Sequence, residues 1–162
     1  MQINKKKILF FILIFLLVFI DFLSKWLIFL FLKNGEKIVI IPNLIEIVLF
    51  FNNGGVFSLG NNVLYIRLFL IIIRFLVLFS LTINSKNILM RNIFYQISFI
   101  LAYAGCIGNL IDILFYWEKI VGFDGVIDWI KLSFFDYVFN LADVYVSLSI
   151  AFLVLNFFRE ND

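Results

Sequence analysis

Two Asn-x-x-Asp pairs interrupt an otherwise apolar chain. Asn109 and Asp112 lie three residues apart near the end of one apolar run, and Asn140 and Asp143 repeat this spacing at the start of another. Asp128 lies in the segment between the two runs. Residues three apart share one face of a helix, so each pair presents a polar face. Because polar groups inside a membrane usually face a partner or a cavity, the three carboxylates are expected to converge on one site.

Two neighbouring carboxylates offer a definite chemistry. They cannot both ionise easily, so they share a proton and their pKa values separate. The ionised group can take a proton from water while the protonated group polarises a carbonyl, as in an aspartyl protease. The alternative interpretation is a hydrogen-bonded network that only packs helices.

Other hydrolytic chemistries are excluded by composition. The chain has no histidine, which removes Ser-His-Asp triads, Cys-His dyads and the usual zinc sites. Cys106 is the single cysteine, lies in an apolar stretch and is interpreted as a packing residue, so no intrachain disulfide can form. We expect neither a metal nor another cofactor. The net charge of +2 and the absence of a basic stripe indicate no nucleic-acid partner.

Two further charged positions lie within apolar runs. Asp21 and Lys25 have the i,i+4 spacing of an ion pair on one helix face, and a structural pair that orients this segment is favoured over direct chemistry. Arg74 lies in the middle of another run. Pairing with Asp21 or snorkelling to the membrane surface is the simplest interpretation of this arginine.

These residues must be positioned by membrane-spanning helices. Hydrophobic residues make up 64% of the 162 residues, against roughly 45–50% in soluble domains. Four apolar runs approach or exceed the ~20 residues that cross a bilayer. We predict a single domain over residues 1–162, mainly α, with transmembrane helices over about 8–32, 63–83, 93–116 and 137–158.

The basic residues predict the orientation of these spans. Lys5, Lys6 and Lys7 precede the first span, Lys86 and Arg91 lie between the second and third, and Arg159 follows the fourth. By the positive-inside rule these segments are cytoplasmic, so both termini are expected inside and the polar pairs near the outer face. No small-residue cleavage site follows the first span, which therefore is expected to stay uncleaved.

The two outer segments differ in character. Residues 38–41 and 44–48 are β-branched runs flanking Pro42-Asn43, which predicts a small hairpin at the membrane surface. In the second outer segment, residues 114–123 form an apolar stretch that is expected to be an amphipathic surface helix or lid.

Five segments, in this order along the chain, resemble motifs of one family. Asp21–Lys25 matches Asp-x-x-x-Lys, Asn52–Ser58 is similar to Asn-x-Gly-Ala-Ala-Phe-Ser, and Gly108–Asp112 matches Gly-Asn-Leu-Ile-Asp. Val126–Trp129 resembles Val-x-Asp-Phe, and Phe139–Asp143 matches Phe-Asn-x-Ala-Asp. The similarity runs over nearly the whole chain, which resembles the lipoprotein signal peptidases (signal peptidase II) of the bacterial inner membrane.

The resemblance implies roles for individual residues. Asp128 and Asp143 would form the catalytic dyad, and the substrate would be a prolipoprotein whose cysteine already carries diacylglycerol, cleaved just before that cysteine. Membrane lipids would be the surroundings and the chain would act as a monomer. Supporting or substrate-binding roles fall to Asn52, Gly54, Asn109, Asp112, Asn140, Asp21 and Lys25.

The chain departs from the family pattern in three places, one of which is the segment 114–123 described above, which is longer and more apolar than the family pattern leads us to expect. Ile113 stands where the family usually has Arg, which removes the usual partner of Asp112, and Lys119 or Lys131 is the substitute that the sequence offers. Gly55-Val56 replaces a small Ala-Ala pair. Two other functions stay open at this stage: a small carboxylate-relay transporter, for which Arg74 is the best support, and a non-catalytic membrane scaffold.

Overall fold

A computed structural model describes residues 2–52, 63–118 and 126–161. Within these ranges the chain forms four long helices, α1 (Gln2–Phe31), α2 (Val63–Ile88), α3 (Ile93–Glu118) and α4 (Leu141–Asn161). Each contains a stretch long and apolar enough to cross a membrane. The predicted four-span architecture is thus confirmed.

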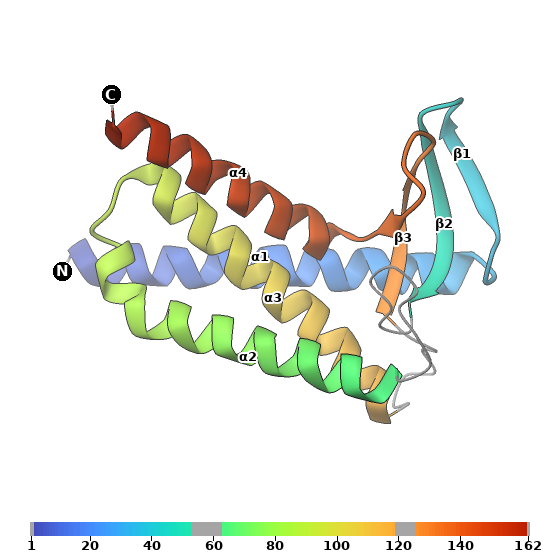
Figure 1. Ribbon diagram of the computed structural model, residues 1–162, viewed down its shortest axis with the longest axis horizontal. Helices are drawn as coiled ribbons and strands as arrows, with labels where there is room; N and C mark the ends of the chain where they lie inside the picture. Colours follow the sequence, from blue (N-terminus) through green and yellow to red (C-terminus); the bar gives the residue numbers. More distant parts are fainter. Residues whose placement is uncertain (1, 53–62, 119–125, 162) are drawn as a thin grey trace.

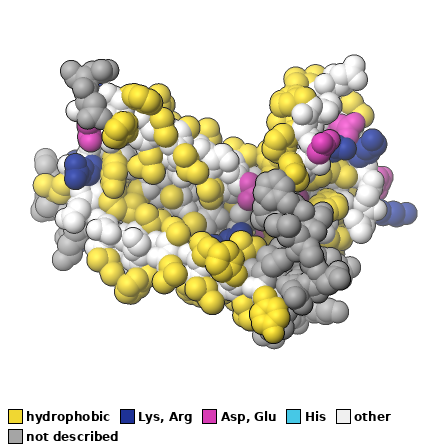
Figure 2. Space-filling view, in the orientation of Figure 1, with side chains coloured by type: hydrophobic (Ala, Val, Ile, Leu, Met, Phe, Trp, Pro, Cys, Tyr) yellow, Lys and Arg dark blue, Asp and Glu magenta, His cyan; other side chains and the backbone are white. Residues whose placement is uncertain are grey.

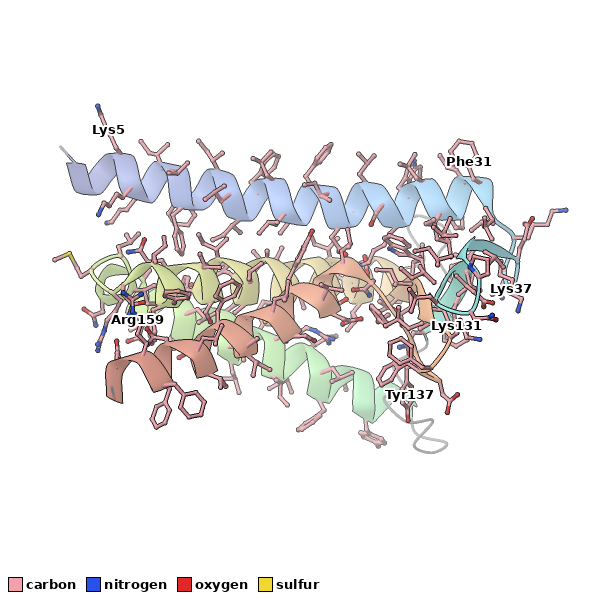
Figure 3. The ribbon with its side chains drawn as sticks, turned by 90° about the horizontal axis from the view of Figure 1, so that it is seen from above. Lys5, Phe31, Lys37, Lys131, Tyr137 and Arg159 are labelled. Carbon is pink, nitrogen blue, oxygen red and sulfur yellow. The ribbon has the colours of Figure 1, made fainter. Side chains whose placement is uncertain are left out.

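Helix α3 is the centre of the bundle and packs against the other three helices. The chain ends of α1 and α4 lie together at the end of the bundle away from the sheet (Figure 1). Lys5 and Arg159 mark this end, whereas Lys37, Lys131 and Tyr137 lie at the opposite one (Figure 3). Many large apolar side chains point outward from the helices, as expected where lipid replaces water as the solvent.

A four-stranded antiparallel sheet covers one end of the bundle, with the order β1-β2-β3-β4 (Figure 1). Its strands are β1 (Lys37–Ile41), β2 (Ile45–Asn52), β3 (Val126–Leu132) and β4 (Val138–Phe139). The predicted hairpin is β1–β2, and Asn43 takes the left-handed conformation of its turn, with φ 57°. The sheet extends beyond the prediction, because β3 and β4 come from the second outer segment and β3 pairs with β2.

The fourth helix begins later than predicted, at Leu141 instead of residue 137. Val138 and Phe139 pair with Lys131 and Ile130 of β3, so their backbone groups belong to the sheet. Asn140 then caps the helix. This short connection places the start of α4 directly beside β3.

Hydrophobic contacts fix the sheet to the bundle. Leu49 of β2 and Ile127 of β3 are buried with Leu32 at the end of α1. Trp26 and Phe29 of α1 pack against this cluster. The later part of β2 and the start of β3 are therefore held at a defined position over the helices.

Candidate active site

The first turn of α4 positions Asp143 through reciprocal capping. The Asn140 side-chain oxygen accepts from the backbone N–H of Asp143 at 3.0 Å, and Asp143 Oδ2 accepts from the backbone N–H of Asn140 at 3.2 Å. This is a capping box with Asn at the N-cap and Asp three residues later. The helix dipole favours a negative charge at this position. The Asn-x-x-Asp spacing thus produces an anchored carboxylate at the helix start.

Asp128 comes to the same place from β3. It lies opposite Phe50 of β2, so Asn52, two residues further along β2, is its diagonal neighbour on the same sheet face. Asn52 Nδ2 donates to Asp128 Oδ2 at 2.9 Å, and Asn140 Nδ2 donates to Asp128 Oδ1 at 2.7 Å. Both oxygens of this buried carboxyl group are therefore engaged by amide donors.

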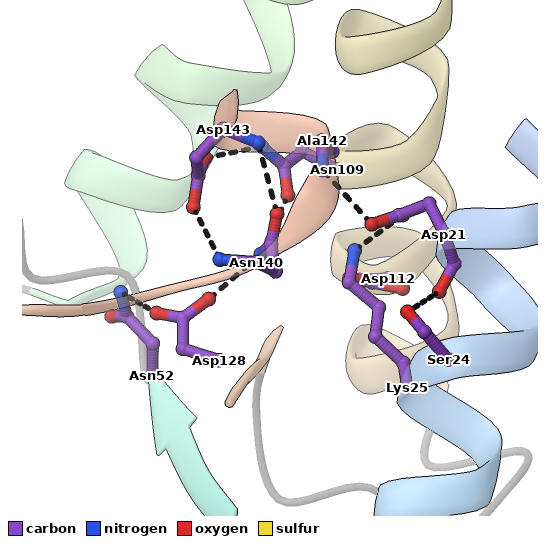
Figure 4. A network of polar contacts seen from close by, with 10 residues as sticks. All are labelled: Asp21, Ser24, Lys25, Asn52, Asn109, Asp112, Asp128, Asn140, Ala142 and Asp143. Atoms are coloured by element: carbon purple, nitrogen blue, oxygen red, sulfur yellow. Dashed lines mark hydrogen bonds and ion pairs between the residues drawn. The ribbon is translucent and has the colours of Figure 1, made fainter. Parts of the chain in front are cut away.

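Asn109 of α3 completes the connection between the two carboxyl groups. Its Nδ2 donates to Asp143 Oδ1 at 2.8 Å, and its Oδ1 accepts from Asn140 Nδ2 at 3.1 Å. Asp128, Asn140, Asn109 and Asp143 thus form one hydrogen-bonded chain (Figure 4). The structure brings together these residues from β3, α3 and α4, as expected, whereas Asp112, the third carboxylate expected at this site, pairs with Lys25.

The two carboxyl groups differ in surroundings. Asp128 is 2% exposed, and burial, followed by the negative charge of Asp143, raises the pKa of Asp128 to about 7. The hydrogen bonds from Asn52 and Asn140 act in the opposite direction, because they stabilise the ionised form. Asp143 is less buried and lies at the positive end of a helix. The pair can therefore hold one proton near neutral pH, with Asp128 as its carrier.

A second polar cluster lies beside the first, on α1 and α3. Lys25 Nζ is 2.6 Å from Asp21 Oδ2 and 2.6 Å from Asp112 Oδ2, and all three side chains are buried. The Asp21–Lys25 pair agrees with the sequence interpretation. The partner of Asp112 does not: it is Lys25, whereas the sequence pointed to Lys119 or Lys131. Lys119 lies outside the described residues, and Ile113 is buried in the packing core.

Asp21 also connects this cluster to the start of α4. Its Oδ1 accepts from the backbone N–H of Ala142 at 2.9 Å, which satisfies one of the free N–H groups of the first helical turn (Figure 4). Gly108 makes this approach possible, since a Cβ at that position would lie 2.6 Å from Asp21 Oδ2. Gly105 similarly allows close contact of α3 with α4, where a Cβ would lie 2.6 Å from the Ala142 carbonyl oxygen.

Two cavities border Asp143. One, of about 470 Å³, lies among α2, α3 and α4, and the other, of about 600 Å³, lies between α4 and the segment around Phe134 and Phe135. Arg74 lines the first cavity together with Asn109 and Asp143. The suggested pairing of Arg74 with Asp21 is therefore wrong, because Asp21 is bonded to Lys25 and to Ala142.

Some predicted features lie outside the described residues. Gly54 belongs to this group together with the other residues from 53 to 58 of the Asn52–Ser58 motif, as do residues 119–123 of the expected surface helix or lid. Residues 114–118 continue helix α3. Among the described residues, no group of three or more His, Cys, Asp or Glu side chains is arranged to hold a metal ion.

Sequence reasoning missed two contributors to the site. The strand character of 126–132 was not recognised, although Val126, Ile127 and Ile130 are β-branched residues. Arg74 was interpreted as pairing with Asp21 or snorkelling, although a charged residue in the middle of a span often faces a functional cavity.

Comparison with known proteins reveals one family. A family model described as "Signal peptidase (SPase) II" matches residues 13–159. A lipoprotein signal peptidase of Streptococcus pyogenes is 33% identical, with 97% of each chain covered. One of Borreliella afzelii is 34% identical, covering 91% of this chain and 89% of the relative. One of Staphylococcus epidermidis is 30% identical, with 90% and 86% covered.

Two solved structures share the fold. Both are described as bacterial membrane enzymes. The first has a TM-score of 0.76 at 22% identity and covers 94% of this chain and 89% of its own. The second has a TM-score of 0.72 at 23% identity, with 91% of both chains covered. The four-helix bundle with its sheet is thus a fold already seen in membrane enzymes.

Proposed function

Since the chain belongs to the signal peptidase II family, we propose that it is an aspartic endopeptidase that removes the signal peptide from diacylglyceryl-modified prolipoproteins. Cleavage would occur just before the lipidated cysteine. The observation that carries the aspartyl chemistry is the pair Asp128 and Asp143, linked through Asn140 and Asn109. Membership of the family supports the substrate class, and the polar network supports the proposed chemistry.

In the proposed mechanism the two carboxyl groups have different tasks. Asp143, at the start of α4 where the helix dipole favours a negative charge, takes a proton from the attacking water while the water oxygen bonds to the scissile carbonyl carbon. Asp128, protonated because its pKa is raised to about 7, donates a hydrogen bond to the carbonyl oxygen. The proton taken by Asp143 then passes to the leaving amide nitrogen as the C–N bond breaks.

The surroundings of the dyad suit a substrate that lies in the membrane. Apolar side chains dominate the two cavities beside Asp143, which would accept the lipid chains and the signal peptide. Binding of these parts would place the scissile bond at the dyad, so that binding performs the positioning. We place the protein in the bacterial inner membrane as a monomer, with both termini in the cytoplasm and the dyad near the outer face.

The test is cleavage of a diacylglyceryl-modified prolipoprotein by the purified protein, with the unlipidated substrate alongside. Asp128→Asn and Asp143→Asn should each lower the cleavage rate at least about 100-fold while thermal unfolding in detergent still shows a folded protein. Asp136→Asn is the matched control, since Asp136 is an exposed outer-segment carboxylate, and should leave the rate unchanged. Cleavage that persists in both dyad variants would leave the aspartic mechanism without support.

A further inference from the structure

The 470 Å³ cavity beside Asp143 contains a charge that the mechanism above does not use. Its described lining comes from α2, α3 and α4 and is largely apolar, including Leu70, Ile73 and Val77. Arg74 is the basic residue of this described lining. Figure 2 looks onto the hollow between α2 and α4, where basic atoms show among hydrophobic side chains.

The guanidinium of Arg74 is not satisfied by the described part of the protein. Its Nη1 is buried and has no hydrogen-bond partner among those residues. The described carboxylates form no ion pair with it, although Asp143 lines the same cavity. Asp143 takes its hydrogen bonds from Asn109 and from the backbone of Asn140 instead. A guanidinium has five N–H donors and no acceptor, so the unfilled requirement is for ligand oxygens.

The position of the Arg74 guanidinium within a membrane span suggests a function, because burying a charged group there costs free energy. Charged groups within membrane spans are expensive to bury and usually serve a substrate or ion pathway. An apolar residue at position 74 would pack in the span without that penalty. The wall of the cavity also includes the Asp143 carboxylate, which would repel an anionic ligand. A neutral carbonyl oxygen on a largely apolar molecule can accept a hydrogen bond from the Arg74 guanidinium, and the Asp143 carboxylate does not repel it as it would an anion.

We propose that Arg74 is a substrate-binding residue, whose guanidinium donates hydrogen bonds to a carbonyl oxygen of the lipidated substrate beside Asp143. The inference rests on the proposed function, since a diacylglyceryl-modified peptide supplies such oxygens in its acyl esters and in its backbone. Both sources offer the same chemistry to the cavity. Arg74 thereby holds the substrate, and the dyad performs the reaction.

The experiment compares Arg74→Met with the parent protein in two measurements. The first is the Kd of a fluorescent diacylglyceryl-modified peptide for the non-cleaving Asp128→Asn protein in detergent micelles. The second is the KM and kcat of cleavage in the otherwise unaltered protein. Loss of a hydrogen bond from a charged donor is expected to raise Kd and KM about 10-fold or more, with a smaller change in kcat. Arg74→Lys should fall between, and Arg91→Met, at an exposed arginine outside the cavity, should match the parent.

A dialkyl-ether analogue of the peptide separates the two sources of oxygen. If the analogue binds weakly to the parent and Arg74→Met weakens it no further, the ester carbonyl is the ligand. If Arg74→Met weakens ester and ether peptides equally, a peptide carbonyl is the ligand. Unchanged Kd and KM in Arg74→Met would overturn the inference. So would thermal unfolding of Arg74→Met and Arg74→Lys at much lower temperature, which marks a structural role.

Failure of the proposed function would look different. In that case the unaltered protein would not cleave the lipidated prolipoprotein. Binding of the lipidated peptide by the Asp128→Asn protein would still report on Arg74, because this measurement requires no catalysis. An Arg74-dependent Kd would then sustain a lipopeptide-binding site without the protease activity.

Discussion

Replacing Asn52 by leucine is expected to move the alkaline limit of cleavage to higher pH. The Asn52 amide donates to Asp128 Oδ2 at 2.9 Å and favours the ionised carboxylate. It therefore lowers the pKa of Asp128, against the larger upward effects of burial and of the Asp143 charge. Leucine has a similar volume and no donor, so it removes the opposing effect. The proposed mechanism requires a protonated Asp128, so the active form should persist to higher pH.

The size of the shift can be worked out from the contacts. With a pKa of about 7, Asp128 is half protonated at pH 7, so cleavage should decline above that pH, to about a tenth of its maximum at pH 8. A hydrogen bond to a charged group contributes about 1.5–3 kcal/mol, and one pKa unit corresponds to about 1.4 kcal/mol. Because the protonated carboxyl group keeps part of the interaction, we expect a shift of about one unit. Cleavage by Asn52→Leu should then be half-maximal near pH 8.

The assay measures kcat/KM for cleavage of a lipidated peptide between about pH 5.5 and pH 9.5. The pH dependence of this ratio reports the pKa values of the essential acid and base in the free enzyme. Each variant is normalised to its own maximum, so that a loss of substrate contact does not affect the position of the limb. Asn87→Leu is the matched control, since Asn87 is exposed at the other end of α2. An alkaline limb that stays in place in Asn52→Leu, or moves to lower pH, would refute the assignment of the proton to Asp128.

Two further predictions concern stability, measured by thermal or chemical unfolding in detergent. Lys25→Met leaves two buried carboxylates unpaired and should lower the free energy of unfolding by about 3–5 kcal/mol, whereas Lys37→Met, at an exposed ion pair, should change it by less than about 1 kcal/mol. Equal effects of the two would contradict the buried ion network. Gly108→Ala places a methyl group 2.6 Å from Asp21 Oδ2 and should cost about 1–3 kcal/mol; a neutral result would mean that α1 moves freely there.

The parts of the fold that depend on local sequence were predictable. A membrane span requires about 20 apolar residues, and each of the four apolar runs of the chain approaches or exceeds this length. The turn at Asn43 is equally local. The start of α4 was misplaced because Val138 and Phe139 are apolar enough to continue the span, and only their pairing with β3 removes them from it.

The parts that depend on long-range contacts were not predictable in detail. The pairing of β2 with β3 joins two outer segments that are separated by two membrane spans, and no local sequence pattern predicts this pairing. Lys25 was correctly paired with Asp21 from their spacing, but its contact with Asp112 needs the packing of α1 on α3. For Arg74 the sequence left pairing with Asp21 and snorkelling open, because neither choice can be made without the packing of the helices. The arrangement of three helices around one cavity places Arg74 near Asp143 instead.

The site also explains why an amide side chain, that of Asn140, stands at this position. Asp143 lies on α4, whereas Asp128 lies on β3, in a sheet that is packed against α1 through a separate hydrophobic cluster. The Asn140 side chain joins the two: one amide N–H group donates to Asp128, its Nδ2 also donates to Asn109, and its oxygen caps the N–H of Asp143. This requires two donors and one acceptor on one short side chain. Serine has a single donor, and an ionised aspartate would bring a further negative charge without any donor. An amide therefore holds two carboxyl groups in one network without adding to their repulsion.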